Sequence, residues 1–138
     1  QRIAVSLGAK TDALHGDPLE VEGVVHSTVD GRYQYTGAMT RGAWANMGPS
    51  IVLDIGEIWV IVCSERLQQR DPEVFRACGL VPEEMDVLVV KSAVHFRAAF
   101  ASLAGAIIEA DGPGLTSLDL QPFPFTRIQR PIFPLDDM

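Results

Sequence analysis

The chain has 138 residues, of which 47% are hydrophobic and 21% are charged, a balance typical of a soluble globular domain with its own core. Its formal net charge of −7 argues against a general nucleic-acid-binding protein, because such a protein needs a basic face to displace counterions from phosphates. No apolar run approaches the roughly 20 residues that a membrane-spanning helix needs, and the N-terminus has no signal-peptide pattern. We therefore expect neither a nucleic-acid partner nor a membrane partner.

The cysteines indicate the redox compartment of the protein, and the first residue indicates whether the chain is part of a longer protein. Cys63 and Cys78 lie apart and match no metal-ligand spacing, and Cys63 lies inside an apolar run. We therefore expect free thiols in a reducing compartment, the cytoplasm, and no disulfide framework. The chain starts at Gln1 without a methionine and runs directly into a strand pattern, which predicts a piece of a longer protein.

The first half of the chain alternates apolar and polar residues, as half-buried β-strands do. Asp30-Gly31 predicts a hairpin turn, because glycine tolerates the positive φ that such turns require. The nearly continuous apolar run 58–63 predicts a central strand that is covered on both faces. The predicted strands cover residues 2–8, 19–29, 32–39, 51–56 and 58–65.

A loop is predicted over residues 40–50, because this stretch contains three helix- and strand-breaking residues and has no period. Within it, Trp44 and Met47 either form an apolar lip over a pocket or fill the core. Gly48 either allows the backbone to approach a ligand closely or makes an ordinary tight bend.

The second half changes from strands to an alternation of helices and strands. Asp71 as N-cap, Pro72 at the first helical position and Gly79 just past the end predict a short helix over 71–79. A strand over 86–91, a helix over 92–105 and a strand over 106–111 follow, an order typical of a βαβ crossover. The four prolines of residues 120–138 predict an extended tail whose phenylalanines fill gaps in the surface.

The predicted fold class is therefore α+β, with a single domain over residues 1–138. It has a β-rich N-terminal half with antiparallel strands, a helix-strand-helix-strand half that resembles a βαβ unit, and an extended proline-rich tail.

The junction between the predicted strand 86–91 and the helix after it holds the best candidate site. If Ser92 caps the helix, the unpaired N–H groups of its first turn and the helix dipole favour an anion there. At about 100° per residue, Ser92 and His95 share one flank of the helix, so Lys91, Ser92 and His95 would bind a substrate carboxylate or another anion together. Arg97 lies on the opposite flank, where it would pair with a carboxylate or a partner surface.

A purely structural role for this junction is an open alternative: Ser92 as a cap, His95 bonded back to it and Lys91 as a solvated strand end. A Ser–His nucleophile pair would also need an orienting acid and an oxyanion hole, which the neighbouring sequence does not supply. His15, His26 and His95 are scattered and no carboxylate stands at ligand spacing, so we expect no metal in this chain. Arg127 and Arg130 in the tail could contact a substrate or partner, or pair with Asp136 and Asp137.

Six stretches in order along the chain carry a resemblance to a known family: "SLGAKTD…GDP", "MGPS", "DPEVFRACGL", "VVKSAVHFRAAF", "DGPG" and "RPIFPLD". Together they resemble the C-terminal domain of the MlrC family, metallopeptidase-like proteins named for microcystinase C. The resemblance spans nearly the whole chain, and "KSAVHFRAAF" and "RPIFPLD" are its most specific parts. Ala9 departs from it, standing where a second glycine is expected, as does Gly112, where the family varies.

The resemblance implies that the zinc ligands and the catalytic groups belong to a larger N-terminal domain of the parent protein. The parent would be a zinc-dependent hydrolase of peptide or amide bonds, and this chain alone would be inactive. Lys91, Ser92 and His95, with Arg97, would then face the cleft between the two domains and contact a peptide-like substrate. Two alternatives stay open: a structural or homo-oligomerisation domain without a catalytic role, and an independent small-molecule binder.

Overall fold

A computed structural model describes residues 1–11, 16–112, 117 and 119–137 of the chain. The chain divides into two compact units, one formed by Gln1–Val5 with Glu20–Ile107 and the other by Ser6–Leu19 with Ile108–Met138. Within the described ranges, no helix is both long enough and apolar enough to cross a membrane. The single domain over 1–138 stays a prediction.

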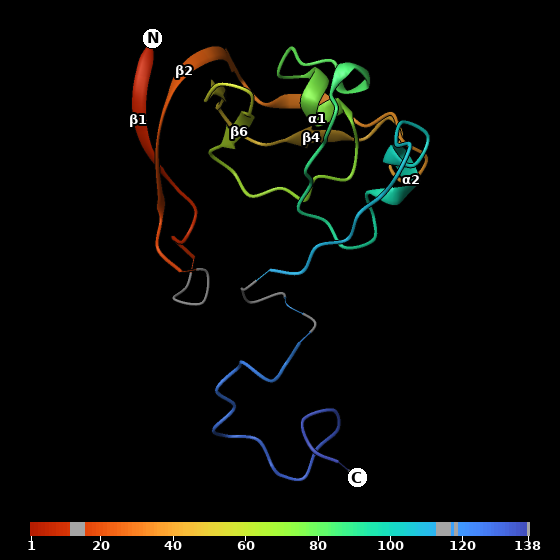
Figure 1. Cartoon of the computed structure of the whole chain (residues 1–138). Coiled ribbons are helices and arrows are strands. Elements are labelled where there is room, and N and C mark those ends of the chain that lie inside the picture. Colours follow the sequence, from red (N-terminus) through yellow and green to blue (C-terminus); the bar gives the residue numbers. More distant parts are fainter. Residues whose placement is uncertain (12–15, 113–116, 118, 138) are drawn as a thin grey trace. The chain divides into compact units, whose positions relative to one another are not determined.

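A four-stranded sheet has the strand order β1 (Arg2–Leu7), β2 (Leu19–Val29), β5 (Ser50–Asp54) and β6 (Trp59–Cys63) (Figure 1). β2 pairs with β5 and β5 pairs with β6, both antiparallel. These strands confirm the alternation seen in the first half of the sequence. The prediction of a central position for 58–63 is wrong, because β6 is the last strand in the sheet order and Trp59 is exposed.

β2 contains a β-bulge at His26. Val25 pairs with Leu53 and Ser27 pairs with Val52, so His26 is an extra residue on its strand. Its imidazole lies against the ring of Trp59 on β6, with the ring centroids 4.7 Å apart. Ser27 Oγ donates a hydrogen bond of 2.9 Å to the carbonyl oxygen of Cys78.

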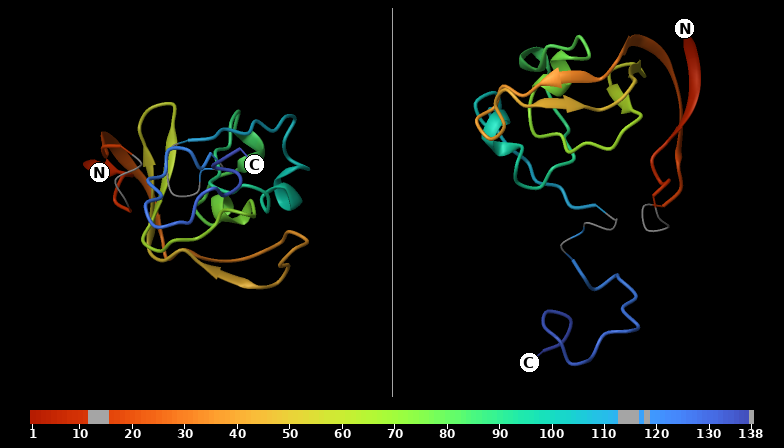
Figure 2. Two further views of the ribbon diagram at one scale, coloured as in Figure 1. Left: turned by 90° about the horizontal axis from the view of Figure 1, so that it is seen from below. Right: turned by 180° about the vertical axis from the view of Figure 1, so that it is seen from behind.

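A second sheet has two antiparallel strands, β3 (Arg32–Gln34) and β4 (Trp44–Asn46), which run side by side in the right-hand view of Figure 2. Because β2 and β3 belong to different sheets, Asp30-Gly31 is not the predicted hairpin turn. Gly31 has a φ of +78°, and a Cβ there would lie 1.9 Å from the carbonyl oxygen of Gly48, so only glycine allows this passage between the sheets. The predicted loop 40–50 thus contains a short strand.

The core lies between the two-stranded sheet, β5 and the chain around α1 (Glu73–Arg76), which packs on β3. Met47 is fully buried whereas Trp44 is 69% exposed, so Met47 fills the core and Trp44 does not. Burial, and to a lesser extent the neighbouring Cys63, raises the pKa of the Cys78 thiol to about 11. The buried apolar cluster consists of Tyr33, Tyr35, Ala45, Met47, Val52, Val74, Cys78 and Leu80.

The predicted βαβ half is not formed. Residues 86–91 and 106–111 have no strand, and a 3₁₀ helix (η1, Pro82–Glu84) precedes the first of these segments. The predicted helix 92–105 is reduced to α2 (Arg97–Phe100). Phe100 of this helix is buried and lies edge-on to Phe75, at 6.1 Å between ring centroids. In the described ranges the fold is therefore mostly β, with two short α-helices.

The second unit has few regular elements among its described residues. Ala9 has a φ of +48°, in the left-handed region that favours glycine, which gives a physical reason for expecting glycine there. In the tail, Arg130 pairs with Asp136, one of the two alternatives for this cation. Phe133 is 77% exposed and does not fill a gap in the surface.

Candidate functional site

The side chains of Ser92 and His95 are brought together by Gln68, a residue that the sequence did not single out. Nε2 of Gln68 donates a hydrogen bond of 3.0 Å to Oγ of Ser92, and its Oε1 lies 3.2 Å from Nδ1 of His95. Ser92 does not cap a helix, because α2 begins only at Arg97. His95 bonds to Gln68 and not back to Ser92, so the cap and the back-bond of the purely structural interpretation are not found.

The two cations of the predicted site, Lys91 and Arg97, have different surroundings. Lys91 is exposed and makes no hydrogen bond or ion pair with any residue in the described part of the chain. The guanidinium of Arg97 lies over the ring of Phe96, with Cζ 5.4 Å from the centroid. Ser92 is half-buried and His95 is exposed, so the cluster of Gln68, Ser92 and His95 is open to a ligand or partner.

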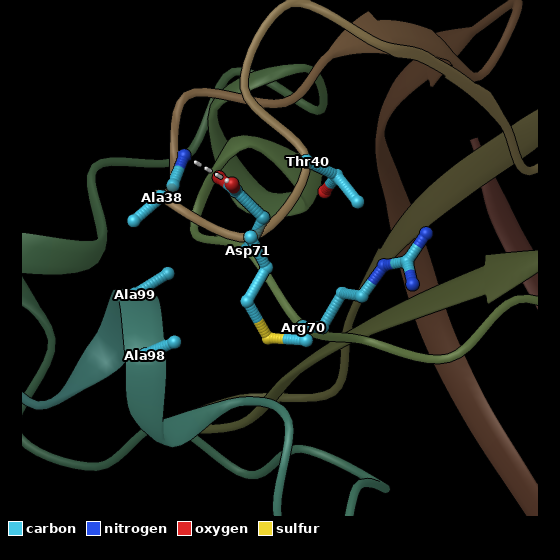
Figure 3. A pocket seen from close by; sticks show the side chains of 8 residues that line it. Ala38, Thr40, Arg70, Asp71, Ala98 and Ala99 are labelled. Carbon is cyan, nitrogen blue, oxygen red and sulfur yellow. Dashed lines mark hydrogen bonds between the residues drawn. The ribbon is translucent and has the colours of Figure 1, made fainter.

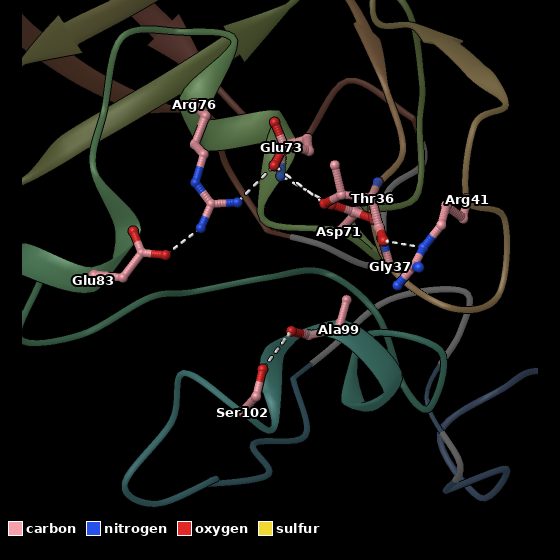
Figure 4. A network of polar contacts seen from close by, with 9 residues as sticks. All are labelled: Thr36, Gly37, Arg41, Asp71, Glu73, Arg76, Glu83, Ala99 and Ser102. Atoms are coloured by element: carbon pink, nitrogen blue, oxygen red, sulfur yellow. Dashed lines mark hydrogen bonds and ion pairs between the residues drawn. The ribbon is translucent and has the colours of Figure 1, made fainter.

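A second polar centre is built around Asp71, which is 2% exposed (Figure 4). Its Oδ1 accepts a hydrogen bond of 3.0 Å from the backbone N–H of Glu73, at the start of α1. Its Oδ2 accepts hydrogen bonds from the backbone N–H groups of Thr36 at 3.1 Å and Gly37 at 2.7 Å. One carboxylate therefore holds the turn after β3 against the first turn of α1, 34–35 residues away in the sequence.

The turn after β3, α1 and α2 enclose a small cavity and an open groove. The cavity, of about 10 Å³, has room for about one water molecule and lies where Asp71 faces the turn of Ala38 and the α2 residues Ala98 and Ala99 (Figure 3). The groove measures about 310 Å³, at the lower limit for small-molecule sites. It is lined by Thr36, Gly37, Ala38, Arg41, Pro72, Arg76, Ala98, Ala99, Ser102 and Leu103.

The charges around this groove largely satisfy one another. Arg76 pairs with Glu73, at 2.6 Å between Nη1 and Oε1, and with Glu83. Partial burial lowers the pKa of Arg76, but its hydrogen bonds to the two carboxylates raise it by more, so the net shift is upward. Arg41 donates from Nε to the carbonyl oxygen of Thr36 at 3.1 Å. The network stabilises the junction of α1 with the turn after β3, and offers no free carboxylate for acid–base chemistry.

Comparison with known protein families assigns the chain to one of them. The family model described as "MlrC C-terminus" matches residues 1–127. The chain belongs to the MlrC C-terminus family. The expected resemblance is therefore confirmed over nearly the whole length. Among curated proteins, no match to the chain is found.

The MlrC C-terminal domain is also similar to a solved structure. A crystal structure described as a "putative metallopeptidase" from Mesorhizobium sp. BNC1 superimposes with a TM-score of 0.88 and 29% sequence identity. The match covers 100% of this chain but only 27% of that one. The present chain thus spans about a quarter of the length of its relative, in which the matching region is joined to a much longer polypeptide.

The described residues of this MlrC C-terminal domain do not form a metal centre. No group of three or more His, Cys, Asp or Glu side chains gathers in the described ranges, and His15 lies outside them. The residues present therefore do not fit a catalytic metal ion. Gln68 was missed because it stands in "SERLQQRD", which has no motif, and its contacts span 24 and 27 residues.

Proposed function

We propose that this MlrC C-terminal domain is the substrate-contacting accessory domain of a zinc-dependent peptide or amide hydrolase, whose metal and catalytic groups lie in an N-terminal domain of the same protein. The observation that carries the proposal is the cluster of Gln68, Ser92 and His95, with the exposed ammonium of Lys91 next to it in sequence. The likeness to a much longer "putative metallopeptidase" chain supports the reaction class.

The side chains of Ser92, His95 and Lys91 are polar and accessible, which suits them to substrate binding. Ser92 and His95 are held by an amide side chain at a surface that lacks a metal set of its own, so they are suited to binding rather than to breaking a bond. A lysine beside them supplies a cation that can stabilise a substrate carboxylate or a developing oxyanion. Each group acts on a substrate whose reacting bond is placed by the other domain.

The test uses the full-length protein and peptide amides that it hydrolyses. His95→Ala and Lys91→Ala are expected to lower kcat/KM at least about tenfold, or ~1.4 kcal/mol of transition-state binding, with metal content and oligomeric state unchanged. Arg66→Ala, which removes another exposed cation of the same unit, is the matched control and should leave kcat/KM unchanged. Unchanged turnover in both test variants would refute the proposal.

A second candidate function, a structural or oligomerisation domain, is favoured by exposed valines next to the same cluster. Val87, Val89 and Val94 are all exposed, and Val89 reaches 85%. Contiguous exposed apolar patches mark protein–protein contacts, and these three valines are exposed within eight residues of one another in the sequence. Under this alternative, Val89→Ser changes the oligomeric state seen by analytical ultracentrifugation, while His95→Ala changes neither turnover nor assembly.

A further inference from the structure

We propose that Gln68 is a positioning residue that presents Nε2 of His95 as a hydrogen-bond acceptor for a peptide N–H group. The inference rests on the proposed function and gives the cluster its ligand, the backbone of an extended peptide. Gln68 does not touch the ligand itself. It acts through His95, whose ring it holds at 3.2 Å.

The chemistry of the amide fixes the hydrogen on the imidazole. Oε1 of Gln68 is a carbonyl oxygen and only accepts, so the Nδ1 atom that faces it must carry the hydrogen of the neutral ring. The other ring nitrogen, Nε2, then carries a lone pair and accepts. Nε2 of Gln68 donates a hydrogen bond of 3.0 Å to Oγ of Ser92, so both ends of the amide have a partner.

His95 and Lys91 have the acceptor and donor character that one peptide unit of a substrate requires. A peptide unit offers one donor, its N–H, and one acceptor, its C=O. His95 Nε2 provides the acceptor that the N–H requires. Lys91, exposed and without an intramolecular partner in the described ranges, provides a donor that its C=O requires. A histidine with its hydrogen on Nε2 would instead repel the N–H, so the tautomer decides whether Nε2 binds the peptide N–H group.

The first measurement identifies the tautomer in the full-length protein. Long-range ¹H–¹⁵N correlation spectra, at a pH where His95 is neutral, are expected to show the hydrogen on Nδ1. Gln68→Ala should release the ring and change the tautomer populations, whereas Gln68→Glu keeps an acceptor for Nδ1–H and should retain them. A hydrogen found on Nε2 of wild-type His95 would overturn the inference, because the amide would then be reversed.

The second measurement is binding of N-acetyl-dialanine amide, followed by the His95 ring resonances and by calorimetry. Gln68→Ala and His95→Ala are expected to weaken binding at least about tenfold, and the double variant no more than His95→Ala alone. Gln69→Ala is the matched control and should bind normally. Among the described residues, the side chain of Gln69 bonds only to the carbonyl oxygen of Leu67, at 2.6 Å. Equal affinity in wild type and Gln68→Ala would overturn the inference.

The outcome separates this inference from the proposed function. If His95→Ala lowers turnover but wild-type Nε2 carries the hydrogen, the substrate-contacting role stands and the role of Gln68 fails. If the tautomer and the probe binding are as expected but turnover is unchanged, the peptide site exists and the hydrolase role of this domain fails.

Discussion

Replacing Asp71 by alanine is expected to lower the free energy of unfolding by about 3–5 kcal/mol. The change removes the acceptor of three backbone N–H groups, and a hydrogen bond to a charged group contributes roughly 1.5–3 kcal/mol. The full sum is not expected, because Thr36 is exposed and its N–H can bond to water after the substitution. Gly37 and Glu73 are half-buried, and each N–H left without a partner costs about 1–3 kcal/mol.

Urea unfolding followed by circular dichroism measures this loss. Asp71→Asn is expected to lose about half as much, because its one remaining oxygen can serve either the turn at Thr36 and Gly37 or the N–H of Glu73. Asp30→Ala is the control: Asp30 is exposed and accepts one backbone hydrogen bond, from Arg32 at 3.1 Å, so about 1 kcal/mol or less is expected. If Asp71→Ala and Asp30→Ala unfold at the same urea concentration, the reasoning about the buried carboxylate is wrong.

Three further changes test other parts of the fold. Gly37→Ala places a Cβ 2.8 Å from Oδ2 of Asp71 and 2.9 Å from Cβ of Ala99. Urea unfolding should therefore show that the free energy of unfolding falls by about 1–3 kcal/mol. An unchanged midpoint would contradict this contact. Ala9→Gly relieves a left-handed backbone conformation that costs about 1–2 kcal/mol, against roughly 0.5–1 kcal/mol of lost chain entropy. A thermal melt should therefore show a gain in stability of up to about 1.5 kcal/mol, and a loss would argue against strain. The raised pKa of Cys78 stabilises the fold below its ordinary value of 9.0, and that stability should disappear as pH rises towards 11. Unfolding measured across pH 8–11 should show this decline in wild type and a smaller one in Cys78→Ala; identical slopes would count against a buried, protonated thiol.

The strands of the first half could be predicted because their alternation records which face is buried within this chain. β2 follows that pattern along most of its length. The predicted helix 71–79 is shortened to Glu73–Arg76, and Pro72, not Asp71, occupies its N-cap position. The position of β6 could not be predicted, because an apolar run shows that a strand is covered but not by what. Here the sheet order ends at β6.

The predictions for the second half of the chain were wrong for two physical reasons. A strand requires a partner, and the apolar run of residues 86–91 has none among the described residues, so Val87 and Val89 are exposed. A helix of about a dozen residues is marginal without packing, and only Phe100 of α2 is buried, so one regular turn remains of the predicted helix. The sequence does contain an apolar run and a helical pattern, but neither pattern determines which other segments pack against it.

Of the candidate site, the proximity of Ser92 and His95 was predicted, whereas its construction was not. Helical spacing gave the wrong reason for this proximity, since the segment 92–96 is not helical. A binding role for Lys91, Ser92, His95 and Arg97 stays a prediction. Gln68 joins them across a long-range contact that no local pattern encodes. The position of Asp71 near the start of a helix was visible in the sequence, while its bonds to Thr36 and Gly37 were not.

The extra residue at His26 is the place where β2 can change length. Val25 pairs with Leu53 and Ser27 with Val52, so deleting His26 would remove the bulge and leave the pairing on both sides in register. The hydroxyl of Ser27 would keep its face of the sheet and its hydrogen bond to the carbonyl oxygen of Cys78. The contact of the imidazole with the ring of Trp59 would be lost. A sequence alignment of relatives that places a gap at this position therefore predicts a regular second strand without that ring contact.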